Sequence, residues 1–416
     1  MLVPLRAPRG VEQIIITLVL FWYSDAMTIP VLYFTGSGLD TDFSSNQVYP
    51  ARRLVLAIMY FFILVLAIPY RKRIIAAWLS NPILLLFVCW AFLSVLWSVA
   101  PEVSLRRSVG ILVATTFGFY LAMFNPREML RLLAWALSLV MLASLIFTLL
   151  IPDIGIMSGT HDGAWRGAFS HKNTLGAYAL LSLIVLSSST LGRHRWAAWL
   201  LSGALLFLSN AKTPIIASTL LVGLFLFARN LNQRSIFSAP KLALFCLFLG
   251  AATSLSLVGI EAVLNLFGGD TTLTGRTRLW ALVWESIQSR FWLGHGFQTD
   301  LVEDLTRGGL PNAHNGLLEV WLGLGLVGAA LILASFFQTL FRAIKDAHLA
   351  GGDAASWTLM FLAYLFLLSV TESSLIGTSS LTWVCYVAAA ALHTQARQHP
   401  PASSPKTQSQ TPIVPS

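Results

Sequence analysis

The stretch IPDIGIMSGTHDGAWRGAFSHKN, residues 151–173, interrupts two long apolar runs and places polar side chains where the second run begins. These side chains are Arg166, His171, Lys172 and Asn173. Polar groups are costly to hold at a membrane boundary, so their placement needs a reason. A second interruption, roughly residues 261–314, brings Arg276, Arg278, His295, His314 and the adjoining Asn315. If both loops lie on one side of a bilayer, they can form a single site for an anionic ligand.

The composition predicts an all-α integral membrane protein. Hydrophobic residues make up 56% of the chain and charged residues 11%, with a mean hydropathy of +0.72, whereas roughly a quarter of the residues in soluble domains are charged. At about 20 apolar residues for each helical span, the sequence predicts a bundle of twelve transmembrane helices. They are 12–34, 53–70, 81–99, 108–124, 128–150, 173–190, 196–209, 213–229, 242–260, 315–341, 357–371 and 375–393. The short pair 196–209 and 213–229 can also be one broken or tilted crossing.

Lysine and arginine predict the orientation, because cytoplasmic loops retain positive charge during insertion. With both termini in the cytoplasm, 16 of the 27 Lys and Arg residues face inward, and the others concentrate around the two interrupting loops. Loops 151–172 and 261–314 are therefore predicted to face outward. Residues 1–398 form the expected membrane domain, and residues 399–416, rich in Pro, Ser, Thr and Gln, are expected to be a disordered cytoplasmic tail.

Metal and disulfide chemistry find little support in the sequence. All three cysteines lie within apolar spans, and His171, His295 and His314 lack metal-ligand spacing. Asp40 and Asp42 form an Asp-x-Asp that can chelate a divalent cation, but such pairs arise often by chance. We therefore expect no metal and no cofactor.

Arginine at a membrane edge is either a snorkelling anchor or a phosphate ligand. Arg52, Arg53, Arg106 and Arg107 abut span ends, which favours anchoring. Arg166 and Arg276 differ, because they lie in the glycine-containing segments RGAFSHKNTLG and TLTGRTRLW. Glycine lets a backbone approach a ligand closely, so these two arginines are predicted to bind one.

The segment TGRTRLWALVWESIQSR, which begins at Thr274, predicts an amphipathic helix. Its apolar residues recur at helical spacing: Leu279, Trp280, Val283, Trp284 and Ile287. We expect Thr274 to be the N-cap and the apolar face to lie at the outer membrane interface. Arg276 and Arg278 then fall near the first turn, whose free amides favour phosphate. A plain interfacial helix with solvated arginines is the alternative.

The segment PNAHNGLLEVWLGLGLVG places His314 and Asn315 directly before a long span. Histidine titrates near neutral pH and can take a proton from an acceptor hydroxyl, although a histidine at a helix start is often only a cap. Glu372, in the turn VTESSLIG, can orient a histidine or a sugar hydroxyl, or can cap the next span. The small residues of GLGLVGAA are explained by close packing of helices.

Taken in order, RGAFSHKNTLG, LSNAKTP, TGRTRLW and AHNGLLEVWLGLGLVG resemble the O-antigen ligase and Wzy-type polysaccharide polymerase superfamily over about residues 160–330. The form RGAFSHKN is most similar to exopolysaccharide polymerases of the succinoglycan type. The resemblance implies a GT-C-like, inverting, metal-independent glycosyltransferase of the bacterial inner membrane. Its donor would be a glycan on undecaprenyl diphosphate, used on the periplasmic side.

By this resemblance Arg166 and Arg276 bind the diphosphate, and His314 activates or positions the acceptor. His171, Lys172 and Asn173 would line the same pocket, and Lys212 stands where many relatives carry arginine. Arg278, Asn315 and Glu372 complete the predicted substrate-binding set.

Several partners and alternatives remain open at this stage. The acceptor is a second glycan or lipid A-core, membrane lipids surround the protein, and a chain-length regulator or export machinery can act with it. No nucleic acid is expected. A polymerase and an O-antigen ligase need the same leaving-group site, so the sequence leaves both open. A transporter or flippase should carry charges deep within its spans, where only Asp25 and Glu319 approach such depth.

Overall fold

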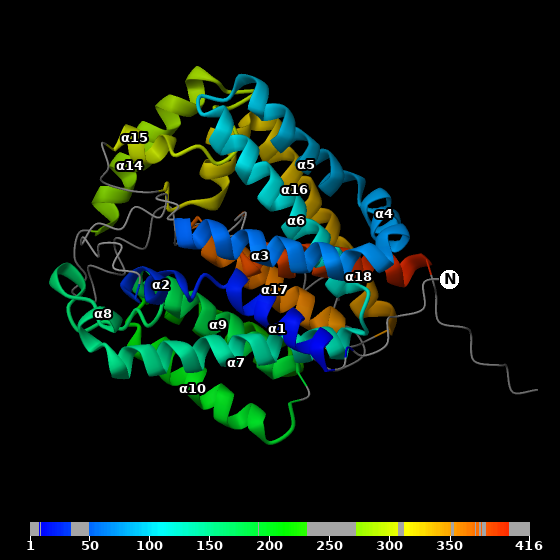
Figure 1. The fold of residues 1–416 in the computed structure, drawn as a ribbon, viewed down its shortest axis with the longest axis vertical. Helices are drawn as coiled ribbons and strands as arrows, with labels where there is room; N and C mark the ends of the chain where they lie inside the picture. Colours follow the sequence, from blue (N-terminus) through cyan, green and yellow to red (C-terminus); the bar gives the residue numbers. More distant parts are fainter. Residues whose placement is uncertain are drawn as a thin grey trace, which may run out of the picture.

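The computed structural model describes residues 8, 10–34, 50–189, 191–230, 272–306, 312–350, 353–370, 372, 373, 376 and 380–398 (Figure 1). This part of the chain is helical apart from its connections and one isolated bridge between Ile156 and Trp165. The α-helices are α1 (Val11–Tyr23), α2 (Thr28–Phe34), α3 (Pro50–Ala67), α4 (Arg71–Ser80), α5 (Pro82–Leu93), α6 (Pro101–Ala122), α7 (Pro126–Leu150), α8 (Pro152–Gly155), α9 (Lys172–Ser188), α10 (His194–Leu208), α11 (Lys212–Asn230), α14 (Thr272–Ser289), α15 (Leu301–Leu305), α16 (Gly316–Ala350), α17 (Asp353–Ser369) and α18 (Leu381–Gln398).

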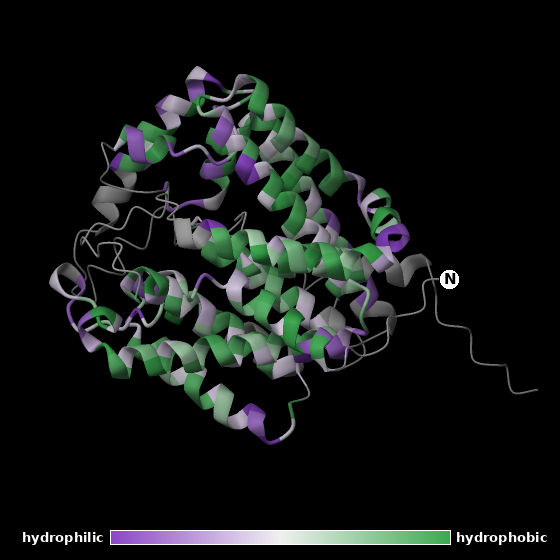
Figure 2. Cartoon of the chain, viewed as in Figure 1, coloured by the Kyte–Doolittle hydropathy of each residue, from purple (hydrophilic) through white to green (hydrophobic). Residues whose placement is uncertain are grey.

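Several helices have the length and apolar character of membrane spans. Within the described residues, three qualify alone, Arg53–Ser80, Pro126–Leu150 and Gly316–Asp346, and the bent pair α1 and α2 would make a fourth. Figure 2 shows apolar residues along the length of α3 and α7, with hydrophilic residues gathered toward helix ends and connections. The expected class, an all-helical polytopic membrane protein, is confirmed. The expected span 242–260 and the tail 399–416 lie outside the described residues.

The first predicted span is broken. Helices α1 and α2 meet at an angle of 85°, so the segment 12–34, predicted as one span, is a bent pair of helices. Asp25 lies in the break with φ 63°, a conformation that a non-glycine residue rarely adopts inside a helix. Its Oδ1 accepts a hydrogen bond of 2.5 Å from Thr28 Oγ1 at the start of α2. Apolar composition therefore gave the correct extent of the segment but concealed its bend.

Residues 71–73, expected in a loop, are helical instead. Helix α3 passes through the 3₁₀ turn Ile68–Tyr70 directly into α4, and the chain leaves the helix only at Asn81, before Pro82. The basic run Arg71, Lys72 and Arg73 contains no glycine or proline that would end a helix. Charge was therefore a poor guide to the helix boundary here.

Helix α16 is kinked at Gly325, where φ is 67° and ψ is −172°. The backbone of the 291–296 segment approaches it there: Leu326 N donates to Phe291 O at 2.8 Å and Gly296 N to Gly323 O at 2.8 Å. A Cβ on Gly294 would lie 2.4 Å from Gly323 O. The expectation that these glycines serve helix–helix packing is therefore wrong, because a non-helical backbone segment approaches the glycines.

Helix α14 forms as predicted, but it starts earlier and packs differently. It begins at Thr272, so Thr274 lies inside the helix and is not its N-cap. Leu279, Val283 and Ile287 are at most 2% exposed, and they pack with Val302, Ala313 and Leu322. This face is therefore buried in protein and not in the membrane interface, although Trp284 is 40% exposed. The helical spacing predicted the apolar face but not what covers it.

Packing in the core fixes helices α9, α16 and α17 relative to one another. Helix α9 packs against α7, α10 and α17, and α16 packs against α5 and α17. Buried polar groups add specific links, including Tyr364 OH, which donates to Ala177 O at 3.1 Å. Because α9, α16 and α17 are fixed in this way, the polar residues at their ends are brought together.

Candidate functional site

Glu372 joins the ends of the two predicted loops. Its Oε1 accepts a hydrogen bond of 2.8 Å from Asn173 Nδ2, at the start of α9. Its Oε2 lies 3.5 Å from His314 Nδ1, just before α16. Asn173 and His314 are far apart in sequence, yet one carboxylate contacts both. The structure therefore brings three of the predicted site residues into one cluster.

His171 is the N-cap of α9. Its Nδ1 accepts a hydrogen bond of 3.2 Å from Asn173 N, which leaves the ring proton on Nε2 when the imidazole is neutral. Burial lowers the pKa of His171 to about 4, although Glu372 opposes this shift, and His161, His314 and Lys172 add to it. His161 lies edge-on to it, with ring centroids 5.3 Å apart. His171 is therefore neutral at physiological pH, and its ring is a structural cap.

Two lysines lie beside this cluster. Lys172 Nζ donates to Asn210 O at 3.2 Å, in the short connection between α10 and α11. Burial and the nearby charge of Lys212 both lower the pKa of Lys172. Lys212 begins α11, so the predicted cations Lys172 and Lys212 face the same region. Two like charges held close together favour an anion between them.

Arg166 is half-buried and partly engaged by backbone. Its Nε donates to Ile154 O at 2.5 Å, and its backbone N donates to Gly155 O at 2.9 Å. Burial lowers the pKa of Arg166, although an arginine remains charged at neutral pH. The next residue, Gly167, has φ 61°, and a Cβ there would lie 2.8 Å from Ser144 Cβ. This glycine therefore lets the segment pack closely against α7.

His314 occupies a turn that several groups hold in place. Its φ is 47°, in the left-handed region, and its backbone N donates to Asn312 Oδ1 at 3.1 Å. The preceding Ala313 donates through N to Glu319 Oε2 at 3.1 Å and accepts through O from Trp280 Nε1 at 2.9 Å. A non-glycine residue persists in this conformation only where its surroundings enforce it, and such sites are often functional.

The remaining predicted residues lie at different distances from this cluster. Asn315 caps α16, with Oδ1 accepting from Leu317 N and Leu318 N at 3.1 and 3.0 Å, and Nδ2 donating to Val370 O at 3.3 Å. Arg278 is exposed on α14. The backbone of Arg276 lies in α14, but its side chain is outside the described residues, as are Asp40 and Asp42. His295 is only 7% exposed and contacts Ser289 Oγ and Leu322 O, so it belongs to the kink.

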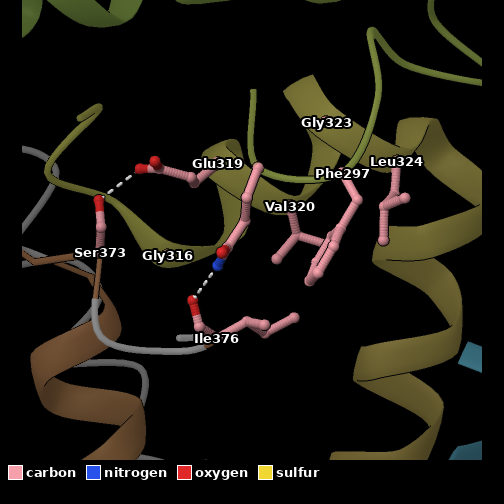
Figure 3. Close-up of a pocket in the computed structure, with 9 residues that line it drawn as sticks. Phe297, Gly316, Glu319, Val320, Gly323, Leu324, Ser373 and Ile376 are labelled. Carbon is pink, nitrogen blue, oxygen red and sulfur yellow. Dashed lines mark hydrogen bonds between the residues drawn. The ribbon is translucent and has the colours of Figure 1, made fainter. Parts of the chain in front are cut away.

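Glu319, Ser373 and Asn312 were not predicted as site residues. Ser373 Oγ donates to Glu319 Oε2 and contacts Asn312 Oδ1 at 3.2 Å. Figure 3 shows Glu319 and Ser373 beside a pocket whose walls include Phe297, Gln298 and Ile376. The signal that could have revealed Glu319 is its position, a carboxylate one turn inside an apolar helix that begins with His314 and Asn315.

The fold and this cluster define a polytopic helical membrane protein with a polar site at its helix ends. Comparison with known proteins agrees with the sequence motifs. The model of the O-antigen ligase family matches residues 196–333. The exopolysaccharide production protein ExoQ of Rhizobium meliloti (strain 1021) is 25% identical over 321 residues, which cover 70% of this chain and 72% of that protein. The resemblance to the O-antigen ligase and Wzy-type polymerase superfamily is confirmed.

The family match includes some of the site and omits the rest. Lys212, Arg276, His314 and Glu319 fall inside residues 196–333, whereas Arg166 and His171 precede them and Glu372 follows. The matching family is described as O-antigen ligase, and the relative from Rhizobium meliloti as an exopolysaccharide production protein.

Proposed function

We propose that the protein polymerises glycan repeat units carried on undecaprenyl diphosphate at the periplasmic face of the bacterial inner membrane. The observation that carries this proposal is the contact of Glu372 with both Asn173 and His314. It joins an imidazole–carboxylate pair to the loop that supplies the basic residues. A proton acceptor and an anion site side by side are what transfer from a diphosphate requires.

In the proposed reaction, an acceptor hydroxyl attacks the anomeric carbon of the donor sugar. His314 takes the hydroxyl proton through Nε2 as the new glycosidic bond forms, and Glu372, next to Nδ1, stabilises the resulting imidazolium. The bond from the anomeric carbon to the diphosphate breaks with inversion, and its electron pair leaves with the phosphate oxygen. The proton then passes from His314 to solvent or to the departing diphosphate.

The departing diphosphate is the anion that the basic residues would bind. Fixed cations stabilise charge that develops in the transition state without reorganising, and arginine matches phosphate geometry best. We assign Arg166 and Arg276 to this role, with Lys172, Lys212 and Arg278 as further cationic contacts. Asn173 and Asn315 would position the glycan next to them. No metal is assigned a step in this mechanism.

An O-antigen ligase is the second candidate, favoured by the description of the matching family. The polymerase is preferred because the similar protein from Rhizobium meliloti is described as an exopolysaccharide production protein. A transporter is a weaker candidate, since Asp25 lies between α1 and α2 and Glu319 lies in the first turn of α16, so neither charge is in the middle of a helix.

A deletion strain separates the polymerase from the ligase. Loss of a polymerase should leave single repeat units on undecaprenyl diphosphate and little high-molecular-weight exopolysaccharide. Loss of a ligase should leave long polymer on the carrier and none on lipid A-core. Gel analysis of lipid-linked and surface glycans distinguishes these outcomes, and long carrier-linked polymer in the mutant would overturn the polymerase proposal.

The sidedness of the site needs its own measurement. We place loops 151–172 and 261–314 in the periplasm and both termini in the cytoplasm. Cysteines introduced at residues 161–165 and 300–306 should react with a membrane-impermeant maleimide added to intact spheroplasts. Labelling of the two stretches from opposite faces of the membrane would contradict a single periplasmic site.

A further inference from the structure

Glu319 connects three segments that surround His314. Its Oε2 accepts the backbone N–H of Ala313 at 3.1 Å and the hydroxyl of Ser373. Ala313 is the residue before His314, and Ser373 follows Glu372, the carboxylate partner of His314. In both hydrogen bonds Oε2 of Glu319 is the acceptor. A single side chain thus fixes the backbone on each side of the His314–Glu372 contact.

The backbone of His314 is in the left-handed conformation, so the hydrogen bonds that Glu319 makes beside it matter for keeping that conformation. A histidine at φ 47° is held there by its neighbours. Asn312 accepts the His314 N–H at 3.1 Å and also contacts Ser373 Oγ, so it belongs to the same network as Glu319. Trp280 of α14 holds the Ala313 carbonyl from the other side. Loss of Glu319 would release two of these restraints together.

Charged and titratable groups reach His314 from three elements. Glu372 faces it at 3.5 Å from the 372–373 turn. Glu319 lies close enough on α16 to interact with it electrostatically, and so does His171 at the start of α9. Arg107 of α6 acts on Glu319 in turn and is itself paired with Asp300 at 2.7 Å. Two carboxylates from different segments therefore act on the imidazole.

We propose that Glu319 is a positioning residue for His314. Glu319 holds the turn at His314 in the left-handed conformation and stabilises the protonated ring of His314. This inference rests on the proposed function only for its consequence in catalysis, because the contacts and the electrostatic effect exist without substrate. Glu319 does not need to touch the glycan. The carboxylates of Glu319 and Glu372 together stabilise His314 when it accepts a proton.

The charge of Glu319 can be tested apart from its hydrogen bonds. Glu319→Gln keeps an oxygen that accepts from Ala313 N and Ser373 Oγ but removes the charge. Diethyl pyrocarbonate reacts with neutral imidazole, and the His314 side chain is 24% exposed, so labelling of the purified full-length protein from about pH 5 to pH 9 reports its titration by peptide mass spectrometry. We expect the midpoint for His314 to fall by about one pH unit in Glu319→Gln, because a nearby negative charge is lost.

A matched control and a second variant complete the design. Glu285→Gln makes the same chemical change on the exposed face of α14 and should leave the His314 midpoint unchanged. Glu319→Asp retains the charge on a shorter arm and should keep a midpoint nearer to that of the parent than Glu319→Gln does. An unchanged midpoint in well-folded Glu319→Gln would overturn the inference.

The labelling result and the polymer assay can fail independently. If Glu319→Gln lowers the His314 midpoint but His314→Ala still makes polymer, Glu319 is a positioning residue and the proposed function is wrong. If the midpoint does not move, the inference about Glu319 falls whatever the polymer assay gives. A normal midpoint with lost polymer would assign Glu319 another role, and would likewise contradict the inference.

Discussion

The starts of α9 and α16 each carry a histidine followed within two residues by an asparagine, but the two histidines have different environments. His171 directs Nδ1 at the Asn173 N–H and is a cap with a pKa lowered to about 4. At α16 the cap is Asn315. His314 is therefore not the cap. Its backbone is in the left-handed conformation, and its Nδ1 lies 3.5 Å from the carboxylate of Glu372. Two similar motifs thus differ: His171 is an N-cap, whereas His314 faces a carboxylate.

The largest effect is expected from substituting His314, and substituting His171 should have a much smaller one. His314→Ala should lower polymer formation by about two to four orders of magnitude, the range typical of losing a general base. His171→Asn should retain most activity, because asparagine is a good N-cap. Surface and lipid-linked glycans from complemented deletion strains measure both variants, with membrane levels of the protein compared on blots. Equal loss in the two variants would remove the distinction between them.

Arg166 and Arg276 test whether the loop before α9 and helix α14 contribute to one anion site. Each change to alanine should cost about 1.5–3 kcal/mol of transition-state stabilisation, or roughly a 10- to 100-fold loss of polymer. Lysine should rescue poorly, since it lacks the planar fork. Arg193→Ala, exposed in the connection between α9 and α10, is the control. Full activity in Arg276→Ala would disprove the assignment.

Glu372 should have an intermediate effect because it serves both helix starts. Glu372→Gln can keep the contact with Asn173 Nδ2 through its amide oxygen while the negative charge next to His314 is lost. We expect about a tenfold drop in polymer formation, together with an acidic limb of the pH profile that moves to lower pH as the imidazolium loses a partner. A profile with an unchanged acidic limb would show that Glu372 serves only to join the segments.

The smallest expected effect is on stability and concerns His171. Its pKa in the folded protein, about 4, lies below the ordinary value of 6.5. The unfolded chain therefore binds a proton first, and the stability tied to this residue falls as the pH drops from about 6.5 to 4. At about 1.4 kcal/mol for each pKa unit, the loss is at most about 3.5 kcal/mol.

Thermal unfolding of the detergent-solubilised protein measures this dependence. The parent should lose stability as the pH is lowered through that window, and His171→Asn should lose less. His194→Asn, exposed at the start of α10, is the control and should follow the parent. Parallel curves for the parent and His171→Asn would show that His171 is not buried as a neutral cap.

The sequence predicted the helical class and much of the cluster, for a clear physical reason. Membrane helices need long apolar runs, so charged residues such as Lys172 and Lys212 stand out at their ends. Polar residues at helix ends meet when those ends pack together, as Asn173, His314 and Glu372 do. The amphipathic spacing of α14 also correctly predicted a helix with Leu279, Val283 and Ile287 on one face, although that face packs on protein and not at the membrane interface.

The sequence was a poor guide where the role of a residue depends on which atoms pack against it in the fold. Gly325 was assigned to helix packing but kinks α16 against the 291–296 backbone. Gly167, in the segment predicted to approach a ligand, packs closely on Ser144. Both positions look like ordinary small residues in the sequence. Glycine serves every close approach equally well, so only the neighbouring atom reveals its role.

Local chemistry readable from the sequence, namely apolar length, charge and titratable groups, established a helical membrane protein and nominated most of its polar cluster. The tertiary structure alone separated His171 from His314 and linked Glu319 to the turn before His314. Burial and partner atoms decide whether an imidazole is a cap or a proton acceptor, and both depend on residues far away in the chain. Glu372 and Asn173 meet only because α9, α16 and α17 pack into one body.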